Sequence, residues 1–443
     1  MDNLSLYLAT YNVGTNDSFD QSLPLLDLLS LSEEKNEKLP DFFVIGLQEV
    51  KSKPMNRLLD ALFDDYWTYA LRNILDERGY VKLKSIRLQG LVLSVFTLRK
   101  HLLNVREIDA EYTRTGKWGI KGAVCIRLNI YGCSICFVNS HLAAHDFNLK
   151  DREADYNNII KDLEFHVEET SKIFCHDYVF WLGDLNFRLT SDYEKTSEEI
   201  ERSILANDLR TLLERDELRY CINKGRSFSE FTEQEPDFAP TFKFKVGTSD
   251  YDHKRRPAWC DRILHRVNSN KYENVTLKVD QLSYKSHPSY MISDHKPVSA
   301  EFIIKTPRPI PTMYDGLSYI SDVFSDYSEH VVQFDKVSSW ERGKKHNKAY
   351  YKITKEIPAN KEDWIGLFRE KFGSLDDYAT YEYISNCATP TEEPEKFEVA
   401  IPGVPSSCRG NYCLLYLSQT EDKVMTVLGI SEPFPIVKPP DRD

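Results

Sequence analysis

Short apolar runs and amphipathic stretches alternate along the first 305 residues, and each kind of pattern predicts its own element. Consecutive apolar and β-branched residues are typical of strands buried on both faces, whereas apolar residues spaced three or four apart indicate a helix with one buried side. The predicted strands cover residues 4–11, 42–47, 91–98, 123–130, 134–139, 178–182, 263–267 and 297–304. Helices are predicted over residues 152–166 and along the stretch after Thr196.

The helical stretch after Thr196 carries two local signals. Thr196 is followed three residues later by Glu199, a spacing that forms a capping box in which each side chain accepts a hydrogen bond from the other residue's backbone N–H. An apolar stripe then continues through Ile200, Ile204, Leu209, Leu212 and Leu213. We expect this stripe to face the core.

The order of these elements predicts a layered α/β domain with a mixed sheet. The predicted strands over residues 123–130 and 134–139 are joined by the turn residues Tyr131-Gly132, so they form an adjacent strand pair. Elsewhere strands alternate with helices, which is the arrangement that covers a sheet on its faces.

The pattern changes near residue 306. Prolines at positions 307, 309 and 311 favour an extended connector, and beyond them the helical signal fades. Short strand-like runs follow at residues 350–353, 364–368, 397–401, 412–417 and 424–428, separated by turn-forming residues. We therefore predict an α/β domain over residues 1–305, a proline-containing linker over 306–318, and a small all-β sandwich over 319–438.

Composition narrows the class of protein. The chain has 443 residues and a formal net charge of −12, which argues against a dedicated nucleic-acid binder because phosphate-backbone affinity comes from clustered Lys and Arg. Its nine cysteines are scattered and form no paired zinc motif, and no signal peptide or membrane-spanning run is evident. We expect reduced thiols and a cytoplasmic location.

Carboxylate and amide side chains follow several of the predicted strands. Glu49, Asp184 and Asp294 each come after an apolar run, and Asn12 and Asn186 lie at similar positions. Mg²⁺ prefers oxygen ligands and binds through one or two carboxylates together with a substrate phosphate. A single such residue is most often a turn or cap residue. Five of them at strand ends in one domain predict a magnesium site for phosphoester hydrolysis.

Two histidines share this placement. His295 directly follows Asp294, and Asp261 is a candidate carboxylate partner that would fix its tautomer and raise its basicity. His141 ends another apolar run. Alone, either histidine is more often structural than catalytic.

Three basic segments accompany these residues, at positions 114–122, 240–245 and 253–257. Basic residues on glycine-rich or proline-bounded loops suit the recognition of several phosphates through charge-assisted hydrogen bonds. In an acidic chain such segments indicate a local pocket for a small polyanion.

The residues above match an ordered set of motifs. They are Tyr-Asn-Val-Gly at 11–14, Gln-Glu at 48–49, Asn-Ser-His-Leu-Ala-Ala-His at 139–145, Gly-Asp-Leu-Asn-Phe-Arg-Leu at 183–189, Arg-Pro-Ala-Trp-Cys-Asp-Arg-Ile-Leu at 256–264 and Ser-Asp-His-Lys-Pro-Val at 293–298. This set resembles the inositol polyphosphate 5-phosphatases, a branch of the endonuclease/exonuclease/phosphatase superfamily. The resemblance covers residues 4–304. It implies a four-layered α/β-sandwich and Mg²⁺-dependent removal of the 5-phosphate from phosphoinositides or soluble inositol phosphates.

The resemblance also implies a role for each site residue. Glu49, supported by Asn12 and with Asp294 nearby, would hold the metal. Asp184 and Asn186 would position the attacking water, His295 with Asp261 would act as base or phosphate stabiliser, and His141 would stabilise the transition state. Whether His295 or Asp184 takes the proton stays open. The substrate-binding residues would be Lys243 and Arg255, which grip the 4-phosphate, together with Lys254, Lys121 and Arg188.

The C-terminal segment resembles a SKICH domain, an Ig-like β-sandwich used for localisation and protein contacts. The matching motifs lie at residues 362–368, 377–381, 412–417 and 429–434. This resemblance implies a protein partner and peripheral contact with a membrane that carries the phosphoinositide head group, at the endoplasmic reticulum, the plasma membrane or both. No nucleic-acid partner is expected.

Other interpretations fit part of the pattern. The substrate could be a soluble inositol phosphate, and a metal-dependent nuclease of the same superfamily would share Asp184, Asn186 and His295. A catalytically silent scaffold would not need the acidic and histidine set. An apolar patch at Leu102-Leu103 and Val105 could touch a bilayer, although burial in the core is an equal alternative.

Overall fold

The computed structural model of the chain describes residues 3–14, 25–32, 38–51, 65–116, 121–272, 275–307, 331–355 and 360–438. We call residues 3–307 the N-terminal domain and residues 331–438 the C-terminal sandwich. Most of the predicted linker, 306–318, and the first residues of the predicted all-β region lie outside the described residues. None of the described helices has the length and apolar character needed to cross a membrane.

Two β-sheets form the centre of the N-terminal domain. The six-stranded sheet has the order β10-β11-β1-β2-β4-β3. Its strands are β1 (Asn3–Asn12), β2 (Phe42–Gln48), β3 (Tyr80–Leu88), β4 (Leu91–Leu98), β10 (Val279–Ser286) and β11 (Val298–Lys305). The second sheet runs β5-β6-β7-β8-β9. Its strands are β5 (Val105–Thr115), β6 (Lys121–Ile130), β7 (Cys133–His141), β8 (Tyr178–Asp184) and β9 (Asp261–Val267).

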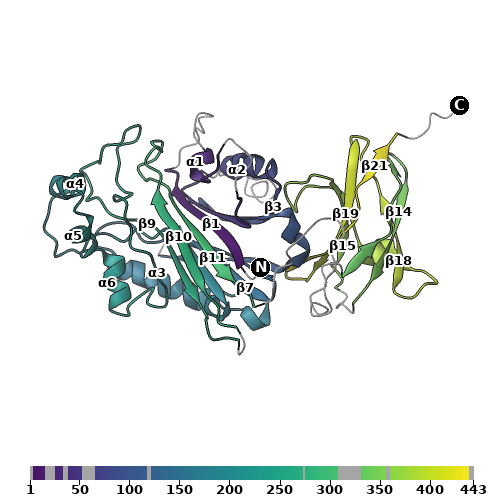
Figure 1. The fold of residues 1–443 in the computed structure, drawn as a ribbon, viewed down its shortest axis with the longest axis horizontal. Helices are drawn as coiled ribbons and strands as arrows, with labels where there is room; N and C mark the ends of the chain where they lie inside the picture. Colours follow the sequence, from purple (N-terminus) through teal and green to yellow (C-terminus); the bar gives the residue numbers. More distant parts are fainter. Residues whose placement is uncertain are drawn as a thin grey trace.

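Helices cover the outer face of each sheet, which makes four layers (Figure 1). In β1, Leu4 and Leu6 face the core between the sheets, whereas the alternate residues Tyr7 and Tyr11 pack with α2 on the outer face. The helices are α1 (Leu25–Leu28), α2 (Tyr66–Asp76), α3 (Leu149–Asp162), α4 (Ser197–Leu205), α5 (Leu209–Leu213) and α6 (Glu217–Asn223). The predicted four-layered α/β-sandwich is confirmed.

Strand direction brings the polar strand ends to one edge. β1 and β2 run parallel, as do β7 and β8, so the residues after these strands meet at the same edge of the two sheets. β9 and β11 run antiparallel to their neighbours and begin at that edge. In the ladder, His141 pairs with Asp184, and Asp184 pairs with Asp261.

The structure corrects several predicted boundaries. The predicted helix 152–166 begins earlier and ends earlier, because Leu163 is already extended. The capping box of Thr196 and Glu199 is present, but the stripe after it is divided between α4 and α5, with Asn207 in a left-handed conformation at the break. The bilayer hypothesis for Leu102-Leu103 and Val105 is wrong, since all three are buried in the core.

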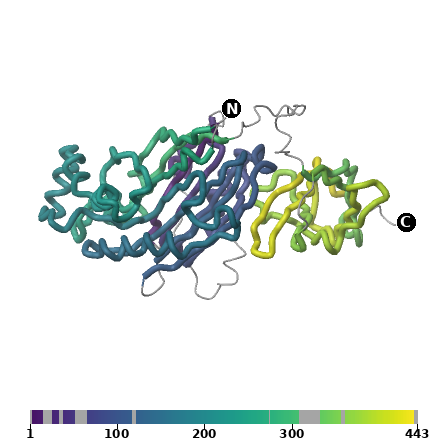
Figure 2. The backbone as a smooth tube through the Cα atoms, turned by 90° about the horizontal axis from the view of Figure 1, so that it is seen from below, coloured from purple at the N-terminus to yellow at the C-terminus, as the bar shows by residue number. Residues whose placement is uncertain are grey.

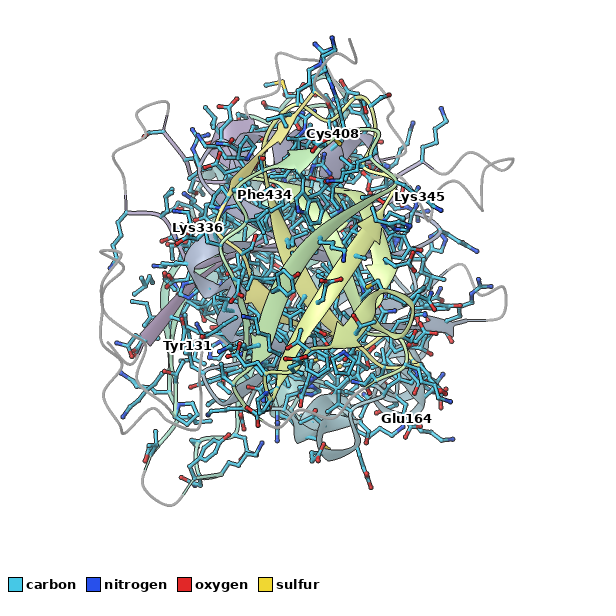
Figure 3. All side chains as sticks on the ribbon, turned by 90° about the vertical axis from the view of Figure 1, so that its right-hand side faces the viewer. Tyr131, Glu164, Lys336, Lys345, Cys408 and Phe434 are labelled. Atoms are coloured by element: carbon cyan, nitrogen blue, oxygen red, sulfur yellow. The ribbon has the colours of Figure 1, made fainter. Side chains whose placement is uncertain are left out.

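The C-terminal residues form the predicted β-sandwich. One sheet has the order β12-β14-β18-β17, and the other contains β13, β21, β19, β20, β15 and β16. Their bounds are β12 (Val332–Phe334), β13 (Trp340–Glu341), β14 (His346–Ile353), β15 (Trp364–Arg369), β16 (Tyr378–Tyr383), α7 (Ile384–Cys387), β17 (Ala388–Pro390), β18 (Lys396–Pro402), β19 (Gly410–Gln419), β20 (Met425–Ile430) and β21 (Phe434–Val437). Figure 3 looks onto this sandwich, and its labelled Phe434 packs against Trp340 in the core between the sheets.

Main-chain pairing joins the sandwich to the N-terminal domain. Met425 of β20 pairs with Ile108 of β5, so the sheet of β5 to β9 continues into the sandwich. The backbone of Lys82 donates to the Gly373 carbonyl over 2.8 Å and accepts from the Leu375 N–H over 3.1 Å. Figure 2 shows these two parts of the chain side by side.

Side chains complete this junction. Phe372 and Leu415 of the sandwich belong to the same buried apolar cluster as the residues between the two N-terminal sheets. The Arg99 guanidinium donates to the Phe372 carbonyl over 2.5 Å and lies 4.2 Å from the centre of the Phe372 ring. Arg72 of α2 forms an ion pair with Asp377 over 3.2 Å. The two parts therefore share one core.

Candidate active site

The carboxylate of Asp184 lies at the centre of the candidate site, at the end of β8. Its Oδ2 accepts a hydrogen bond from the Asn12 amide over 3.0 Å and lies 3.2 Å from His141 Nε2 and 3.8 Å from His295 Nε2. Its Oδ1 accepts the backbone N–H of Asn186 over 3.1 Å. Predicted site residues from separate segments thus meet on one carboxylate, which is 1% exposed.

His295 is held on its other side by Asp261. His295 Nδ1 lies 2.9 Å from Asp261 Oδ2, and the Thr241 hydroxyl donates to the same oxygen over 2.7 Å. All three residues are buried. The pair with Asp261 at Nδ1 leaves Nε2 facing Asp184.

Burial and charge oppose each other in this cluster. Burial lowers the pKa of His295, but the Asp261 and Asp184 carboxylates outweigh burial and raise it to about 9. Burial raises the pKa of Asp261. Burial would also raise the pKa of Asp184, yet His295 and His141 hold it well below its ordinary value. In the metal-free protein His295 is therefore a cation and Asp184 an anion at neutral pH.

Lys121 reaches the site through His141, which lies on the Asp184 carboxylate. The Lys121 ammonium hydrogen-bonds to His141 Nε2, and Glu49 Oε1 lies 4.0 Å from the same nitrogen. Burial lowers the pKa of Lys121. The structure thus brings Lys121, predicted from its basic loop, into the centre of the site.

Two site residues have backbone conformations that side chains rarely adopt. Glu49 has φ of 57° and Asn186 has φ of 56°. Such left-handed conformations persist where the surrounding structure imposes them, and they cluster at functional sites. The strand ends therefore aim these two side chains by means of unfavourable backbone geometry.

A buried polar network is built around Gln48, the residue directly before Glu49. The Gln48 amide donates to Asn139 Oδ1 over 2.7 Å and to the Thr10 hydroxyl over 3.0 Å, which links β1, β2 and β7. The Asn139 amide in turn donates to the carbonyl of Leu47 over 3.1 Å. A fully paired polar network of this kind fixes one arrangement of the two sheets beside Glu49.

The donor set fits a hard cation such as Mg²⁺. The Glu49 and Asp184 carboxylates both lie near His141 Nε2, the Asn12 side chain contacts Asp184, and no sulfur atom is among these groups. Asp261 Oδ1 is buried with no hydrogen-bond partner among the described residues. Asp294, the third predicted metal ligand, is held instead by an ion pair with Lys243. Among the described residues, the sets with three possible ligand atoms within 4.8 Å are Asp184, Asp261 and His295, and Asp109, Glu111 and His166.

The predicted substrate-binding residues differ in their placement. Lys243 lies at the site against Asp294, and Arg255 is exposed with its guanidinium 3.4 Å from His145 Nδ1. Lys254 is exposed on the same loop, where its backbone N–H donates to Asp252. The side chains of Lys254 and Arg255 are therefore accessible from solvent, whereas Lys243 is held by Asp294.

Arg188 is buried and contacts another site residue. Its guanidinium hydrogen-bonds to Asn186 Oδ1 and donates to the Asn186 carbonyl over 3.1 Å. It also lies 4.2 Å from the centre of the Phe242 ring. The structure therefore gives Arg188 a contact with Asn186 in addition to the substrate role predicted from the sequence.

Thr241 and Phe242 lie at the site but were not among the predicted catalytic, metal-binding or substrate-binding residues. Both lie in the basic segment 240–245, which was singled out for its lysines. The only sequence signal was the polar Thr241 beside Pro240 in an otherwise apolar and basic loop, and that signal does not reveal a contact with Asp261.

Comparison with known proteins gives the following matches. Residues 9–301 match Endonuclease/Exonuclease/phosphatase family 2, and residues 332–436 match the SKICH domain. The chain is 34% identical over 98% of its length to mouse (Mus musculus) phosphatidylinositol 4,5-bisphosphate 5-phosphatase A, of which it covers 42%. It is 30% identical over 98% of its length to mouse inositol polyphosphate 5-phosphatase K, of which it covers 90%.

A solved structure agrees with these matches. The crystal structure of the inositol polyphosphate 5-phosphatase domain of SPsynaptojanin, in complex with inositol (1,4)-bisphosphate and a calcium ion, is 30% identical, with a TM-score of 0.56. The match covers 69% of this chain and 86% of that domain. The chain thus spans about two fifths of the first relative and nearly the whole of the second.

Proposed function

Because the chain belongs to the endonuclease/exonuclease/phosphatase family, and within it to the inositol polyphosphate 5-phosphatases, we propose that it hydrolyses the 5-phosphate of phosphoinositides with Mg²⁺ as cofactor. The observation that carries this proposal is the buried Asp184 carboxylate, which contacts Asn12, His141 and His295 at the edge where the strands end. Lys243 and Arg255 supply positive charge around it for further phosphates.

In this mechanism Asp184 and Asn186 hold the water in line with phosphorus. Asp184 is an anion and offers oxygens to a water proton, whereas His295, a cation in the metal-free protein, balances negative charge on the phosphate. Asp261 keeps His295 oriented. His141 lies beside the same oxygen of Asp184, and the Lys121 ammonium, which donates to His141 Nε2, adds positive charge where negative charge develops in the transition state.

Glu49, Asn12 and Asp184 would hold the Mg²⁺ ion. When bound, the ion supplies positive charge to the phosphate oxygens. Asp294 would join these ligands only by leaving its ion pair with Lys243, which would free Lys243 for the substrate. In this proposal binding of metal and of substrate are therefore linked through one pair of side chains.

We propose phosphatidylinositol 4,5-bisphosphate and phosphatidylinositol 3,4,5-trisphosphate as substrates, so that the enzyme would dampen phosphoinositide signalling. The names of the similar phosphatases and the basic residues Lys243 and Arg255 support a substrate with a neighbouring phosphate. A soluble inositol phosphate is the alternative. It is favoured by the inositol (1,4)-bisphosphate held by the solved relative, which is what remains of inositol 1,4,5-trisphosphate without its 5-phosphate.

The loops near the site support a lipid substrate. Phe147 is 89% exposed just after the loop that carries His145, and Val246 is 59% exposed beside Lys245. The loops of Val246 and Met291 are tied by a hydrogen bond from the Gly247 N–H to the Met291 carbonyl over 2.7 Å. Exposed apolar side chains next to basic ones suit the surface of an anionic membrane. We propose peripheral membrane contact from the cytoplasm, at the endoplasmic reticulum or plasma membrane, with a protein partner for the SKICH domain.

The first experiment measures phosphate release from phosphatidylinositol 4,5-bisphosphate by the purified chain, with and without Mg²⁺. We expect Mg²⁺-dependent release that Asp184→Ala abolishes. Asp192→Ala is the matched control, because Asp192 is exposed and pairs with Arg215 away from the strand ends. Release at the wild-type rate from Asp184→Ala contradicts the assignment.

A substrate panel separates the alternatives. Inositol 1,4,5-trisphosphate in place of the lipid tests the soluble substrate, and single-stranded and double-stranded DNA test the nuclease. Faster turnover of the soluble compound, or cleavage of DNA, would reassign the substrate. Absence of turnover on the whole panel would favour a silent scaffold.

Membrane contact is tested on vesicles that contain the lipid. We expect Phe147→Ser to reduce hydrolysis of the vesicle lipid several-fold while hydrolysis of inositol 1,4,5-trisphosphate is unchanged. Leu282→Ser is the matched control, because Leu282 is 59% exposed in the middle of β10. An equal loss on both substrates contradicts the membrane role of Phe147.

A further inference from the structure

Three consecutive residues outside both sheets each contact a different part of the site. The Thr241 hydroxyl donates to Asp261, the Phe242 ring contacts His295, and the Lys243 ammonium pairs with Asp294. One short loop therefore touches the side chains that arrive from β9 and from the segment before β11.

Thr241 controls the position of the Asp261 carboxylate. Asp261 Oδ2 takes both the Thr241 hydroxyl, at 2.7 Å, and His295 Nδ1, at 2.9 Å. Asp261 Oδ1 is buried and has no hydrogen-bond partner among the described residues. Rotation of the carboxylate is therefore restrained through one oxygen. Without the Thr241 hydroxyl, that oxygen would be held by His295 alone.

Phe242 contacts two cationic groups of the site. Its ring centre lies 4.6 Å from the ring centre of His295, with the planes at 42°, and 4.2 Å from the guanidinium carbon of Arg188. Aromatic faces attract cations at such distances. Because Arg188 also holds the amide of Asn186, the single ring of Phe242 connects His295 with Asn186.

The loop is anchored firmly enough to transmit these contacts. Phe242 donates its N–H to the Ala258 carbonyl over 3.2 Å and accepts from the Ala258 N–H over 2.9 Å. The Thr241 carbonyl accepts the Lys296 N–H over 2.9 Å, directly after His295. Thr241 and Phe242 are both buried. The loop is thus pinned to the segments that carry Asp261 and His295.

We propose that Thr241 and Phe242 are positioning residues of the phosphatase. Thr241 orients His295 through Asp261. Phe242 fixes the separation of His295 and Arg188, and Arg188 in turn holds the Asn186 amide. This inference rests on the proposed function for its kinetic consequence. The contacts themselves do not depend on it. Neither residue touches the reacting atoms, so both act on the rate of the chemical step more than on substrate affinity.

The kinetic experiment compares pairs of variants in the full chain with Mg²⁺ and phosphatidylinositol 4,5-bisphosphate. We expect Thr241→Val, which keeps the shape and loses the donor, to lower kcat at least tenfold with KM nearly unchanged, and Thr241→Ser to restore most of it. We expect Phe242→Leu to lower kcat similarly and Phe242→Tyr to retain it. Phe96→Leu is the control for loss of a buried ring, because Phe96 packs beside α2 away from this loop.

A second readout does not require activity. The Nδ1 proton of His295, shared with Asp261, gives a low-field proton resonance in the metal-free protein, assigned by its loss in His295→Gln. We expect Thr241→Val to shift or broaden this resonance while Thr241→Ser and Phe96→Leu leave it unchanged. If the variants show this pattern but the wild-type chain has no phosphatase activity, the proposed function is overturned and the positioning roles stay supported.

Two results overturn the inference. One is a Thr241→Val protein that folds with an unaltered His295 resonance and a wild-type kcat. The other is a loss of kcat that Thr241→Ser and Phe242→Tyr fail to restore, because such a loss reflects general damage to the loop.

Discussion

The two ends of the five-stranded sheet β5 to β9 are built on opposite principles. At the end where β7 and β8 finish, ionisable side chains are buried close together and compete for partners. Asp184 and Asp261 face the same imidazole of His295, and one oxygen of Asp261 has no hydrogen-bond partner among the described residues. This end therefore holds buried charge that the described residues do not fully pair.

At the opposite end, buried charge is matched within the protein. The Arg127 guanidinium is fully buried, and it donates to the Glu107 carboxylate over 2.9 Å and to the Thr170 hydroxyl over 2.8 Å. The Glu107 backbone N–H donates to Thr426 of the C-terminal sandwich over 2.9 Å. Beside these contacts lies the shared apolar core of the junction.

The difference separates activity from stability along the same strands. Charges buried without full compensation destabilise a fold and are retained where chemistry needs them, whereas apolar burial and paired main chain stabilise it. We therefore expect substitutions at the first end to change turnover and substitutions at the second end to change the free energy of unfolding.

The largest expected effect is on turnover at the Asp184 end. Asp184→Asn keeps the shape and removes the negative charge, so we expect kcat to fall by about 10³-fold or more. In metal-free protein, the midpoint of thermal unfolding should fall only slightly, since the attraction of His295 and His141 that, despite burial, holds the pKa of Asp184 below its ordinary value is lost while the shape is kept. A large loss of thermal stability in this variant would contradict the comparison.

The next effect is on stability at the junction. Phe372 is 2% exposed in the shared core, so Phe372→Ala should lower the free energy of unfolding by about 3–5 kcal/mol, measured by urea denaturation. We expect kcat with a soluble substrate to change less than twofold at a temperature where the variant is folded. Tyr350→Ala, on the exposed side of β14, is the control. Independent unfolding of the sandwich would show that the junction is not part of one cooperative core.

Two histidines test the comparison through pH. Burial and then the Arg127 charge lower the pKa of His176 to about 4, so its neutral form stabilises the fold above its ordinary pKa of 6.5 and this contribution is lost as the pH falls through about 4. Against the effect of burial, the Asp261 and Asp184 carboxylates raise the pKa of His295 to about 9. Its cationic form therefore stabilises the fold fully below pH 6.5, and this stabilisation is lost as the pH rises through about 9. Each amounts to at most about 3 kcal/mol.

The measurement is the free energy of unfolding of metal-free protein across this pH range. His176→Gln should flatten the acid side of the stability curve, and His295→Gln should flatten the alkaline side. If either substitution flattens the side assigned to the other histidine, the opposite roles of the two ends are wrong.

The smallest effect is expected from the ion pair between α2 and the sandwich. The side chains of Arg72 and Asp377 are 22% and 33% exposed, so Asp377→Asn should lower the free energy of unfolding by less than about 1 kcal/mol. The difference should shrink further in high salt, as screening of an exposed pair requires. A loss as large as that of Phe372→Ala would mean that charge, not apolar burial, holds the junction.

The sequence predicted the central strands well and the edge strands poorly, for a physical reason. β1 and β8 are buried on both faces, so their apolar runs stand out. β3 and β10 lie at the two edges of the six-stranded sheet, where the polar residues among their apolar ones hide the strand pattern. α2 was missed as well, although its buried residues Trp67, Leu71 and Leu75 do follow a helical spacing.

The site was predictable where residue type and strand position coincide. Asp184 and His295 follow apolar runs and carry ionisable groups, so the sequence alone marks them. The contacts of Thr241 and Phe242 depend on a loop that returns to the site from outside the sheets, and neither periodicity nor charge encodes such a return. The ion pair between Asp294 and Lys243 was missed for the same reason, since each residue had been assigned to a different ligand.

The pairing of Ile108 with Met425 has a mechanical consequence. One sheet runs from the active-site edge into the sandwich, so the N-terminal domain and the sandwich cannot rotate independently of each other. Figure 1 shows β1 running away from the sandwich toward the active-site edge. Under the proposed membrane contact, a surface that bound the sandwich would also set the angle at which the active site faces that surface. The distance and tilt of a lipid head group would then be selected by this geometry, before any side chain of the site touched it.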